Sequence, residues 1–452
     1  MEQTDSRSRR SSGRLPRRFP LLAALGLAGL GLASPQEAPR QIIIDASIQR
    51  FAIPDCIPRR GDEASREACR TLTQVLRDDL RFEGLFQFVA DNLYSAIPPL
   101  SADAINYDDW KGIGAKILVV TRAEVTAGEL AVELKVYFVD TRQTMLAKRY
   151  SGRLDNPRIF AHQASDDIMT LTQYRGVART KIAFASDRDS AGARRPSKEL
   201  YIADYDGFGP RRLTVNGSIN ILPAWTPDGR SLAYVSYRQG VPQIYLASIF
   251  EGRSTPNLTG ERGSQAFAPA FSHDGKHITF ASNRSGNMEI WVANADGSGA
   301  RNLTRSAASE TAPCWSRTDQ QIAFTSNRGG TPQIYVMDSE GLSVERLTKV
   351  SNYNDAPAWN PSKLYTEIAY TSRLEGARFQ IAVVDVATGV VRQISEGRGS
   401  CEYPSWAPSG RHLVFSCQRS GTWQITVGDR EGRNVRTLGA GPGNNVQPDW
   451  GP

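Results

Sequence analysis

The sequence predicts an all-β six-bladed β-propeller in the C-terminal part of the chain, after a smaller N-terminal α/β domain. Two observations predict the propeller: a segment of about 44 residues recurs between residues 178 and 452, and the fragments at the two ends of this region complement each other. The N-terminal domain is expected because residues 40–170 lack the repeat and alternate between helical and strand-like patterns.

The repeat centres on an aromatic residue that ends a Pro-x-aromatic motif. Examples are LPAWTPDG at 222–229, APAFSHDG at 268–275 and YPSWAPSG at 403–410. Successive aromatic residues lie 46, 44, 44, 47 and 44 positions apart, a spacing typical of propeller blades. We expect buried packing anchors rather than ligand platforms, because burying an aromatic ring removes roughly 150–250 Å² of surface from water. The anchors are Trp225, Phe271, Trp315, Trp359, Trp406 and Trp450.

Each repeat holds four short runs that are typical of strands, here named A to D. Strand A ends at the aromatic anchor, and runs such as HITFASNRSG, MEIWVANADG and RNLTR supply strands B, C and D. The Asp-Gly pairs at 228–229 and 274–275 are typical of a tight turn from A to B. The sequence therefore predicts blades of four antiparallel strands.

The two ends of the repeat region predict how the ring closes. Residues 180–215 supply strands B, C and D without a strand A, whereas VQPDW at 446–450 is a strand A that stands alone. We predict that 446–450 joins the first fragment as a sixth blade, within a propeller spanning 178–452, because an unclosed ring would expose unpaired strand edges. The alternative is an open solenoid, which would need no complementary fragments at its ends.

The N-terminus has the pattern of an export signal. Residues 1–18 carry +4 of the formal charge of +7, and residues 19–33 are apolar and rich in glycine. A basic segment before an apolar stretch too short to span a bilayer predicts a cleaved signal peptide over residues 1–33. An uncleaved anchor is the alternative. The remaining +3 does not favour a nucleic-acid partner.

The domain before the propeller shows both helical and strand patterns. Residues 66–80 and the stretch from Phe160 to Leu171 have amphipathic helical spacing, and 115–125 with 129–140 resemble a hairpin. The five cysteines allow two disulfides. Cys401 and Cys417 flank a predicted hairpin, and Cys56 and Cys69 bracket a loop, which leaves Cys314 as a small buried side chain.

Motifs for catalysis or metal binding are not found in the sequence. There is no Gly-x-Ser-x-Gly motif and no glycine-rich phosphate loop after a strand. His273 and His277 fall across a predicted turn rather than on one helix face, so their spacing does not predict a metal site. The carboxylate pairs 78–79 and 166–167 are expected to be solvated on helix faces. We therefore predict no catalytic residue, cofactor or metal.

An arginine recurs after strand B in every blade, and loops B–C and D–A are expected to open on one face of the ring. One interpretation is that the arginines bridge neighbouring blades through hydrogen bonds. Another is that they form a positive mouth that steers an acidic partner towards the channel. The six are Arg188, Arg238, Arg284, Arg328, Arg373 and Arg419.

The residues just ahead of the anchors are expected on the same face, and their aromatic, lysine-poor composition favours a contact surface. They include Asn220 and Asn445. The predicted partner-binding residues of this propeller mouth are Gln265, Phe267, Ala268, Thr311, Ala312, Tyr353, Asp355, Glu402, Tyr403, Arg284 and Arg328.

The combination of these features resembles the TolB family of the Tol-Pal system over essentially the whole mature chain. It rests on an exported α/β domain, six blades with APAF/WSPDG-like and SNR-like motifs, a closing Pro-x-Trp, and the stretches at 164–167 and 179–183. The resemblance implies a non-enzymatic periplasmic adaptor that supports outer-membrane integrity and envelope constriction at cell division.

The resemblance also implies two partners. The propeller mouth would bind a Pal-type peptidoglycan-associated lipoprotein, and the segment 34–49 would bind a TolA-type inner-membrane protein. The N-terminal site residues are then Arg40, Gln41, Ile42, Ile43, Ile44 and Asp45, whose apolar run could add a strand to a partner sheet. The family's mouth positions match Gln265, Ala268, Thr311 and Ala312.

Two other functions remain open from the sequence. A secreted propeller hydrolase or lyase would require convergent titratable groups in the channel. A carbohydrate-binding module would require exposed rather than buried aromatic side chains. The fold alone does not choose among them, because propellers host many functions.

Overall fold

The computed structural model describes residues 45, 49–100, 104–190, 193–251, 254, 258–259, 263–374, 378–397 and 399–452. The predicted signal peptide and the site residues from Arg40 to Ile44 lie outside the described residues. Asp45, the last residue of the predicted N-terminal site, is described and is exposed.

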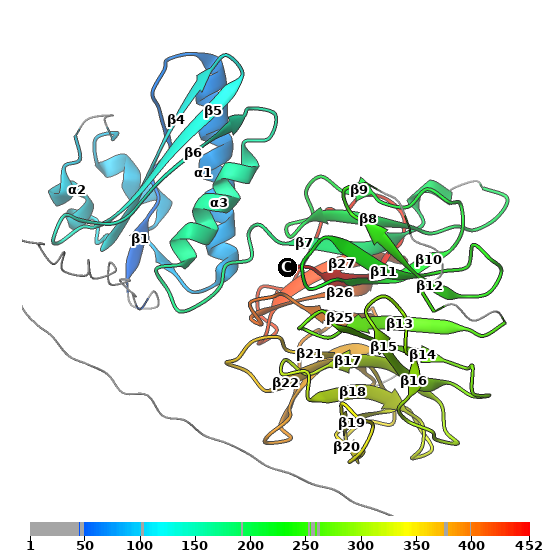
Figure 1. Ribbon diagram of the computed structural model, residues 1–452. Coiled ribbons are helices and arrows are strands. Elements are labelled where there is room, and N and C mark those ends of the chain that lie inside the picture. The colour runs from blue at the N-terminus through cyan, green and yellow to red at the C-terminus, as the bar shows by residue number, and fades with distance from the viewer. Residues whose placement is uncertain are drawn as a thin grey trace, which may run out of the picture. The chain divides into compact units, whose positions relative to one another are not determined.

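The N-terminal domain is a mixed sheet packed against helices (Figure 1). Its strands follow the order β3-β1-β4-β5-β6, with β2 paired to β4. The strands are β1 Arg50–Ala52, β2 Ile57–Pro58, β3 Gln87–Phe88, β4 Ile117–Thr126, β5 Glu129–Phe138 and β6 Gln143–Arg153. The helices are α1 Glu63–Glu83, the 3-10 helix η1 Asp91–Ala96, α2 Tyr107–Gly112 and α3 Arg158–Met169.

Helix α1 has clear start and stop signals. The Asp62 carboxylate accepts a hydrogen bond from the Ser65 backbone N–H at 2.8 Å, and Gly84 ends the helix with a φ of 66°. The apolar stripe that includes Leu72 and Leu76 is buried in the core with α3 and the central strands, as the helical spacing predicts. Strand β6 was not predicted, because its mostly exposed residues do not alternate between apolar and polar.

The propeller consists of six sheets arranged around a channel, and the predicted fold class is confirmed. Blade 1 contains β10 Asn220–Trp225, β11 Ser231–Ser236 and β12 Gln243–Ser248. Blade 2 contains β13 Ala266–Phe271, β14 His277–Ser282, β15 Glu289–Asn294 and β16 Arg301–Asn302. Blade 3 contains β17 Glu310–Trp315, β18 Gln321–Ser326, β19 Gln333–Asp338 and β20 Glu345–Arg346. Blade 4 contains β21 Asn354–Trp359, β22 Glu367–Ser372, β23 Gln380–Asp385 and β24 Val391–Gln393.

Blades 5 and 6 complete the ring. Blade 5 contains β25 Cys401–Trp406, β26 His412–Arg419, β27 Thr422–Asp429 and β28 Arg436–Thr437. Blade 6 joins the C-terminal β29 Asn445–Trp450 to β7 Lys181–Ser186, β8 Glu199–Asp204 and β9 Arg211–Arg212. The 3-10 helix η2 Arg188–Ser190 follows β7. Strand β29 pairs antiparallel with β7, with Trp450 opposite Ile182, so the terminal fragment closes the ring as predicted.

The anchors hold neighbouring blades together. The indole N–H of Trp315 donates to the Ala270 carbonyl of the preceding blade at 3.2 Å, and Trp406 reaches Ala358 in the same way at 3.0 Å. Trp450 instead donates to the Thr180 hydroxyl at 2.7 Å. The anchors of blades 1, 3, 5 and 6 are buried as predicted, whereas Phe271 and Trp359 are half-buried. Trp225, Trp315 and Trp406 therefore combine apolar burial with a hydrogen bond to the neighbouring blade.

The cysteines pair as the sequence allows. Cys56 is bonded to Cys69, which links the segment before α1 to the helix itself. Cys401 is bonded to Cys417 across the register of β25 and β26. Cys314 is free and half-buried, and it lines the channel.

An ion pair buried between α1 and the propeller joins the two domains. The Glu83 carboxylate accepts hydrogen bonds from the Arg411 guanidinium at 2.9 Å and from the Val177 N–H at 3.0 Å. The Glu83 side chain is 1% exposed and that of Arg411 is 8% exposed. Burial raises the pKa of Glu83 to about 7, although Arg411 opposes the shift.

The expectation that both helix carboxylate pairs are solvated is wrong for one member of each pair. Asp79 is buried and accepts hydrogen bonds from His162 at 2.8 Å and from the Tyr205 hydroxyl of blade 6 at 2.7 Å. The side chain of Asp166 is 10% exposed and binds the guanidinium of Arg179. Helix periodicity could not reveal this, because the partners lie outside the helix that carries each carboxylate.

Replacing the closing anchor should weaken the whole ring. Trp450→Ala removes a side chain packed against Ile182 and Phe184 and is expected to lower stability by about 3–5 kcal/mol. A thermal melt followed by circular dichroism measures the change. Phe250→Ala, at a side chain that is 74% exposed, is the control and should melt like the wild type. A Trp450→Ala midpoint equal to that of the control would contradict the role of the clasp.

Breaking the buried ion pair should also destabilise the protein. Arg411→Met leaves Glu83 buried without its cation, and we expect a loss of about 3–5 kcal/mol. The double variant Glu83→Gln, Arg411→Met should recover part of this loss, because no uncompensated charge remains. Denaturant unfolding of the single and double variants measures both effects. A double variant no more stable than Arg411→Met would refute this explanation.

Candidate functional site

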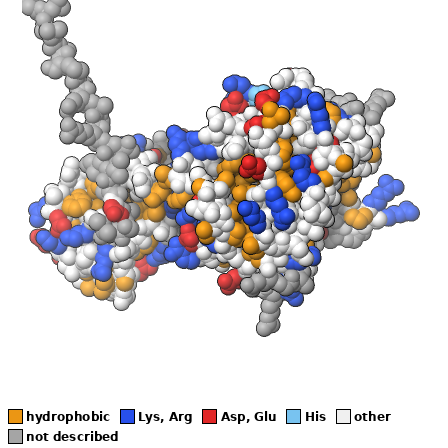
Figure 2. All heavy atoms as spheres, turned by 90° about the horizontal axis from the view of Figure 1, so that it is seen from below, with side chains coloured by type: hydrophobic (Ala, Val, Ile, Leu, Met, Phe, Trp, Pro, Cys, Tyr) orange, Lys and Arg blue, Asp and Glu red, His pale blue; other side chains and the backbone are white. Residues whose placement is uncertain are grey.

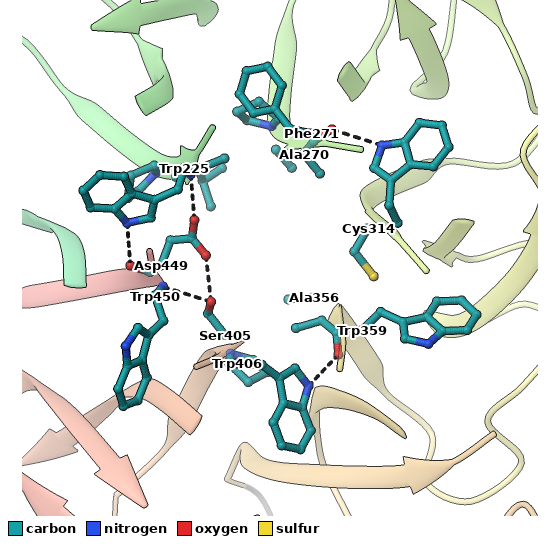
Figure 3. A pocket seen from close by; sticks show the side chains of 18 of the residues that line it. Trp225, Ala270, Phe271, Cys314, Ala356, Trp359, Ser405, Trp406, Asp449 and Trp450 are labelled. Carbon is teal, nitrogen blue, oxygen red and sulfur yellow. Dashed lines mark hydrogen bonds between the residues drawn. The ribbon is translucent and has the colours of Figure 1, made fainter. Parts of the chain in front are cut away.

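The inner strands of the six blades enclose a channel with a cavity of about 700 Å³. Its wall is made mainly of proline, alanine and aromatic side chains from strands β10, β13, β17, β21, β25 and β29 (Figure 3). The fifth position of these strands is small in most blades, which leaves the channel open. The residues at that position are Ala224, Ala270, Cys314, Ala358, Ser405 and Asp449.

A bulge recurs at one end of every inner strand. The residue before each proline has a positive φ of 48° to 57° and interrupts the register with strand B, as between Phe267 and Ala270 in blade 2. A non-glycine residue in this region is strained, and bulges redirect backbone groups next to functional sites. The six residues are Leu222, Ala268, Ala312, Ala356, Tyr403 and Gln447. We call this end of the channel the bulge end.

The bulge turns a backbone N–H towards the preceding blade. The Ala356 N–H donates to the Thr325 hydroxyl at 3.2 Å, and the Tyr403 N–H donates to the Thr371 hydroxyl at 3.1 Å. At the corresponding place facing Ala268 and Ala312 stand Val235 and Ala281, which have no hydroxyl. The N–H groups of Ala268 and Ala312 therefore lack the hydroxyl acceptor that Thr325 of blade 3 and Thr371 of blade 4 supply to the next blade.

Most residues predicted for the propeller mouth lie at this bulge end. Phe267, Ala268, Thr311, Ala312, Asp355 and Tyr403 line the channel cavity. Gln265 is exposed, and its backbone N–H donates to the side-chain oxygen of Asn283 in loop B–C at 2.7 Å. This contact places loop B–C beside the start of strand A, as strand alternation predicts. Tyr353 and Glu402 do not line the cavity but are half-buried on the same strands or their approach.

Blades 4 and 5 bring acidic and aromatic side chains together at the bulge end. The Tyr353 hydroxyl donates to the Asp355 carboxylate at 3.2 Å. Burial, and then the charge of Asp355, raises the pKa of Glu402. Burial also raises the pKa of Tyr403. This side of the mouth thus offers two carboxylates and two phenol rings, whereas the lining residues of blades 2 and 3 are uncharged, namely Phe267, Ala268, Thr311 and Ala312.

Five of the six recurring arginines lie over aromatic rings of their own blades. The guanidinium of Arg238 lies 3.6 Å from the ring centre of Tyr245, and that of Arg284 lies 4.8 Å from Trp291. Arg284 also donates to the Thr259 carbonyl in the connector from the preceding blade at 3.3 Å. Arg328 binds Glu310 at 3.1 Å. These arginines brace the loops around the bulge end, and they are not among the residues that line the cavity.

The two histidines separated by four positions do not converge on a common site. The His273 ring lies 3.2 Å from Asp319, whose carboxylate also accepts the backbone N–H of His273 and of Asp274. His277 is exposed on the next strand. Within the described ranges, three or more His, Cys, Asp or Glu side chains do not gather as a metal site would require.

Asp449 lies where three blades meet (Figure 3). Its carboxylate accepts the Trp225 backbone N–H at 2.8 Å and the Ser405 hydroxyl at 2.7 Å. The Trp225 indole N–H also donates to the Asp449 carbonyl at 3.1 Å. Burial raises the pKa of Asp449 to about 6, and these hydrogen bonds oppose the shift. The sequence signal was the single acidic residue at a position that is small in the other blades.

On the face in Figure 2, basic, acidic and hydrophobic side chains are interspersed over the molecule. Two titratable side chains of the channel, Asp449 and His273, are engaged by their own neighbours. In the part of the chain that the structure describes, no helix is long and apolar enough to cross a bilayer.

The buried carboxylate of Asp449 should make stability depend on pH. Its folded pKa of about 6 is above the ordinary value of 3.8, so the folded state binds the proton more tightly. This tighter proton binding stabilises the folded state fully below the ordinary pKa, and the stabilisation is lost as the pH rises through 6. The free energy of unfolding changes by roughly 3 kcal/mol at most. Asp449→Asn keeps an acceptor for Trp225 and removes the titration.

Thermal midpoints of the wild type and of Asp449→Asn, measured from pH 4 to pH 8, test this expectation. The variant should gain stability relative to the wild type as the pH rises, with most of the change between pH 4 and pH 7. A difference between the two proteins that stays constant over this range would show that Asp449 does not titrate there.

Comparisons with known proteins agree with this architecture. A family model described as the TolB beta propeller domain matches residues 168–452, and one described as the TolB amino-terminal domain matches residues 44–145. The Tol-Pal system protein TolB of Methylobacillus flagellatus is 41% identical over 90% of each chain. The crystal structure of TolB from Acinetobacter baumannii has a TM-score of 0.75 at 27% identity and covers 89% of this chain and 96% of that one.

Other relatives match over a shorter stretch. The Tol-Pal system proteins TolB of Desulfosudis oleivorans and Geobacter metallireducens are 32% and 35% identical over 45% and 44% of this chain. In both cases the matching stretch spans about half of the relative, at 46% of its length. The two family models together cover both domains, and the Methylobacillus relative aligns along most of the chain. The chain belongs to the TolB family of Tol-Pal system proteins.

Proposed function

We propose that this protein is a non-enzymatic periplasmic adaptor of the Tol-Pal system. Its propeller mouth binds a Pal-type lipoprotein, and the segment 34–49 binds a TolA-type inner-membrane protein. Through these contacts it supports outer-membrane integrity and envelope constriction at cell division. The signal peptide predicted over residues 1–33 delivers it to the periplasm.

The observation that carries the proposal is the bulge end of the channel. It presents half-buried apolar and aromatic side chains beside two carboxylates, a composition suited to a protein partner. The N–H groups of Ala268 and Ala312 have no hydroxyl from the neighbouring blade to receive them, so a carbonyl or carboxylate of the partner can accept there. Asp355 and Glu402 favour a basic group of the partner on the opposite side.

The buried anchors favour the adaptor over a carbohydrate-binding module. Four of the six anchors, Trp225, Trp315, Trp406 and Trp450, are at most 8% exposed and do not offer rings on which a sugar could stack, while Phe271 and Trp359 are half-buried. An enzyme would need a titratable group free to exchange a proton with a substrate. Asp449, which is the carboxylate in the middle of the channel wall, is instead committed to its neighbours by two hydrogen bonds.

A binding assay with purified Pal-type lipoprotein domain tests the mouth. Thr311→Arg places a long cation at the half-buried rim of blade 3 and should weaken binding by at least about tenfold, which corresponds to 1.4 kcal/mol. Lys363→Ala, at an exposed position beyond the opposite end of strand β21, is the matched control and should bind like the wild type. Equal affinity of all three proteins would refute the mouth as the binding site.

The N-terminal partner is tested separately. A chain that begins at residue 50 should lose binding to a TolA-type domain while it keeps its affinity for the Pal-type domain. Circular dichroism confirms that the shortened chain retains its fold. If the shortened chain binds the TolA-type domain as well as the mature protein does, the segment 34–49 is not the binding element.

A further inference from the structure

The side chain of one buried arginine in the N-terminal domain makes no hydrogen bond to any described residue. Arg122 lies in the middle of β4, between β2 and β5, where it faces Ile57 on one side and Glu133 on the other. Its side chain is 7% exposed. Among the described residues its guanidinium has no hydrogen-bond partner, and its Nε is fully buried. A guanidinium carries five N–H donors, and burying them without acceptors is costly.

The carboxylate nearest to Arg122 is occupied by other cations. Glu133 Oε2 lies 3.9 Å from the Arg122 Nη1, which is too long for a hydrogen bond. The same carboxylate binds Arg59 through Oε2 and Lys135 through Oε1, the latter at 2.9 Å. Glu133 therefore does not satisfy Arg122.

Arg122 lines a pocket on the face of the sheet that α1 and α3 leave uncovered. Its chain neighbour Ala123 belongs to the core beneath these helices, so strand alternation directs Arg122 to the opposite face. The pocket has a volume of about 290 Å³. It is formed by the segment after β2 and by β4, β5 and β6, so its walls are strands rather than mobile loops.

The pocket carries an excess of positive charge. Arg59, Arg122, Lys135, Lys148 and Arg149 line it against two carboxylates, Glu124 and Glu133. Lys148 and Arg149 come from the edge strand β6 and form no ion pair within the described residues. Counted together with Arg122 itself, the five cations and two carboxylates leave a net of three positive charges lining the pocket.

We propose that this pocket binds a phosphate group carried on a small polar molecule or headgroup. The planar fork of Arg122 can donate two parallel hydrogen bonds to an oxyanion, and the surrounding cations match a dianion. The pocket has room for roughly ten water molecules, which exceeds what a bare ion fills and suits a group such as glycerol phosphate. The site is independent of the adaptor function, since it lies in the N-terminal sheet and not at the propeller mouth.

The two sources of such a group, a free metabolite and a lipid headgroup, are separated by the choice of probe. The mature protein is titrated with inorganic phosphate and with glycerol 3-phosphate at constant ionic strength, with chloride as the reference anion, and its thermal midpoint is followed. Its binding to phosphatidylglycerol vesicles is compared with its binding to phosphatidylcholine vesicles. Saturable stabilisation by the free compounds indicates a free ligand, and Arg122-dependent vesicle binding indicates a headgroup.

Three variants assign the binding to the pocket. Arg122→Met and Arg149→Met should each weaken phosphate or headgroup binding by about tenfold or more. Arg149 is exposed, so its replacement tests the pocket even if Arg122→Met folds poorly. Arg153→Met is the control, because this arginine ends the same strand outside the pocket, with a side chain that is 84% exposed.

A further signature distinguishes a ligand site from a structural arginine. Without phosphate, Arg122→Met should melt at or above the wild-type midpoint, because a long apolar side chain replaces an unsatisfied buried cation. With phosphate present, the thermal midpoint of the wild type should rise above that of the variant. The proposal is overturned if phosphate, glycerol 3-phosphate and phosphatidylglycerol vesicles act no differently from chloride and phosphatidylcholine, or if both pocket variants bind like the Arg153→Met control.

Discussion

The pairing of β29 with β7 is the interaction on which the rest of the structure depends. It joins the last residues of the chain to the first strand of the propeller, with Trp450 opposite Ile182. Every blade then packs between two neighbours, and β7 has a paired strand on the side that faces the channel. The same closure creates a surface for the N-terminal domain, because Phe82 of α1 shares a core cluster with Trp450 and Ile182. Ring and domain interface are therefore coupled through one strand.

Closure also fixes the channel and the polarity of its ends. The six bulges lie at the end where the inner strands begin, and the turns from A to B lie at the other end. The N-terminal domain contacts the start of β26 at the turn end through Glu83 and Arg411. The bulge end, with its apolar and acidic rim, is therefore the end at which we place a partner. Asp449 both lines the channel and links three blades through its hydrogen bonds.

Charged side chains serve different purposes in the two domains. In the propeller, five of the six recurring arginines lie over aromatic rings, and several of these also bind nearby acceptors, so their charge is used for packing. At the domain interface, Arg411 is buried with a carboxylate that compensates it. Arg122 is buried without such a partner, and this contrast within one molecule is why a ligand is inferred for it. The amino-acid composition alone does not distinguish these arginines.

The sequence by itself determined the number of blades, their order and the closing strand, because these follow from a local pattern that recurs with a fixed period and from fragments that complement each other. It also indicated which end of the channel carries the aromatic and small residues. Only the tertiary structure decided that Asp79 and Glu83 are buried, that Asp449 joins three blades, and that Arg122 lacks an acceptor. The physical reason is that burial and hydrogen bonding of a charged side chain depend on partners far away in the chain, which no local periodicity encodes.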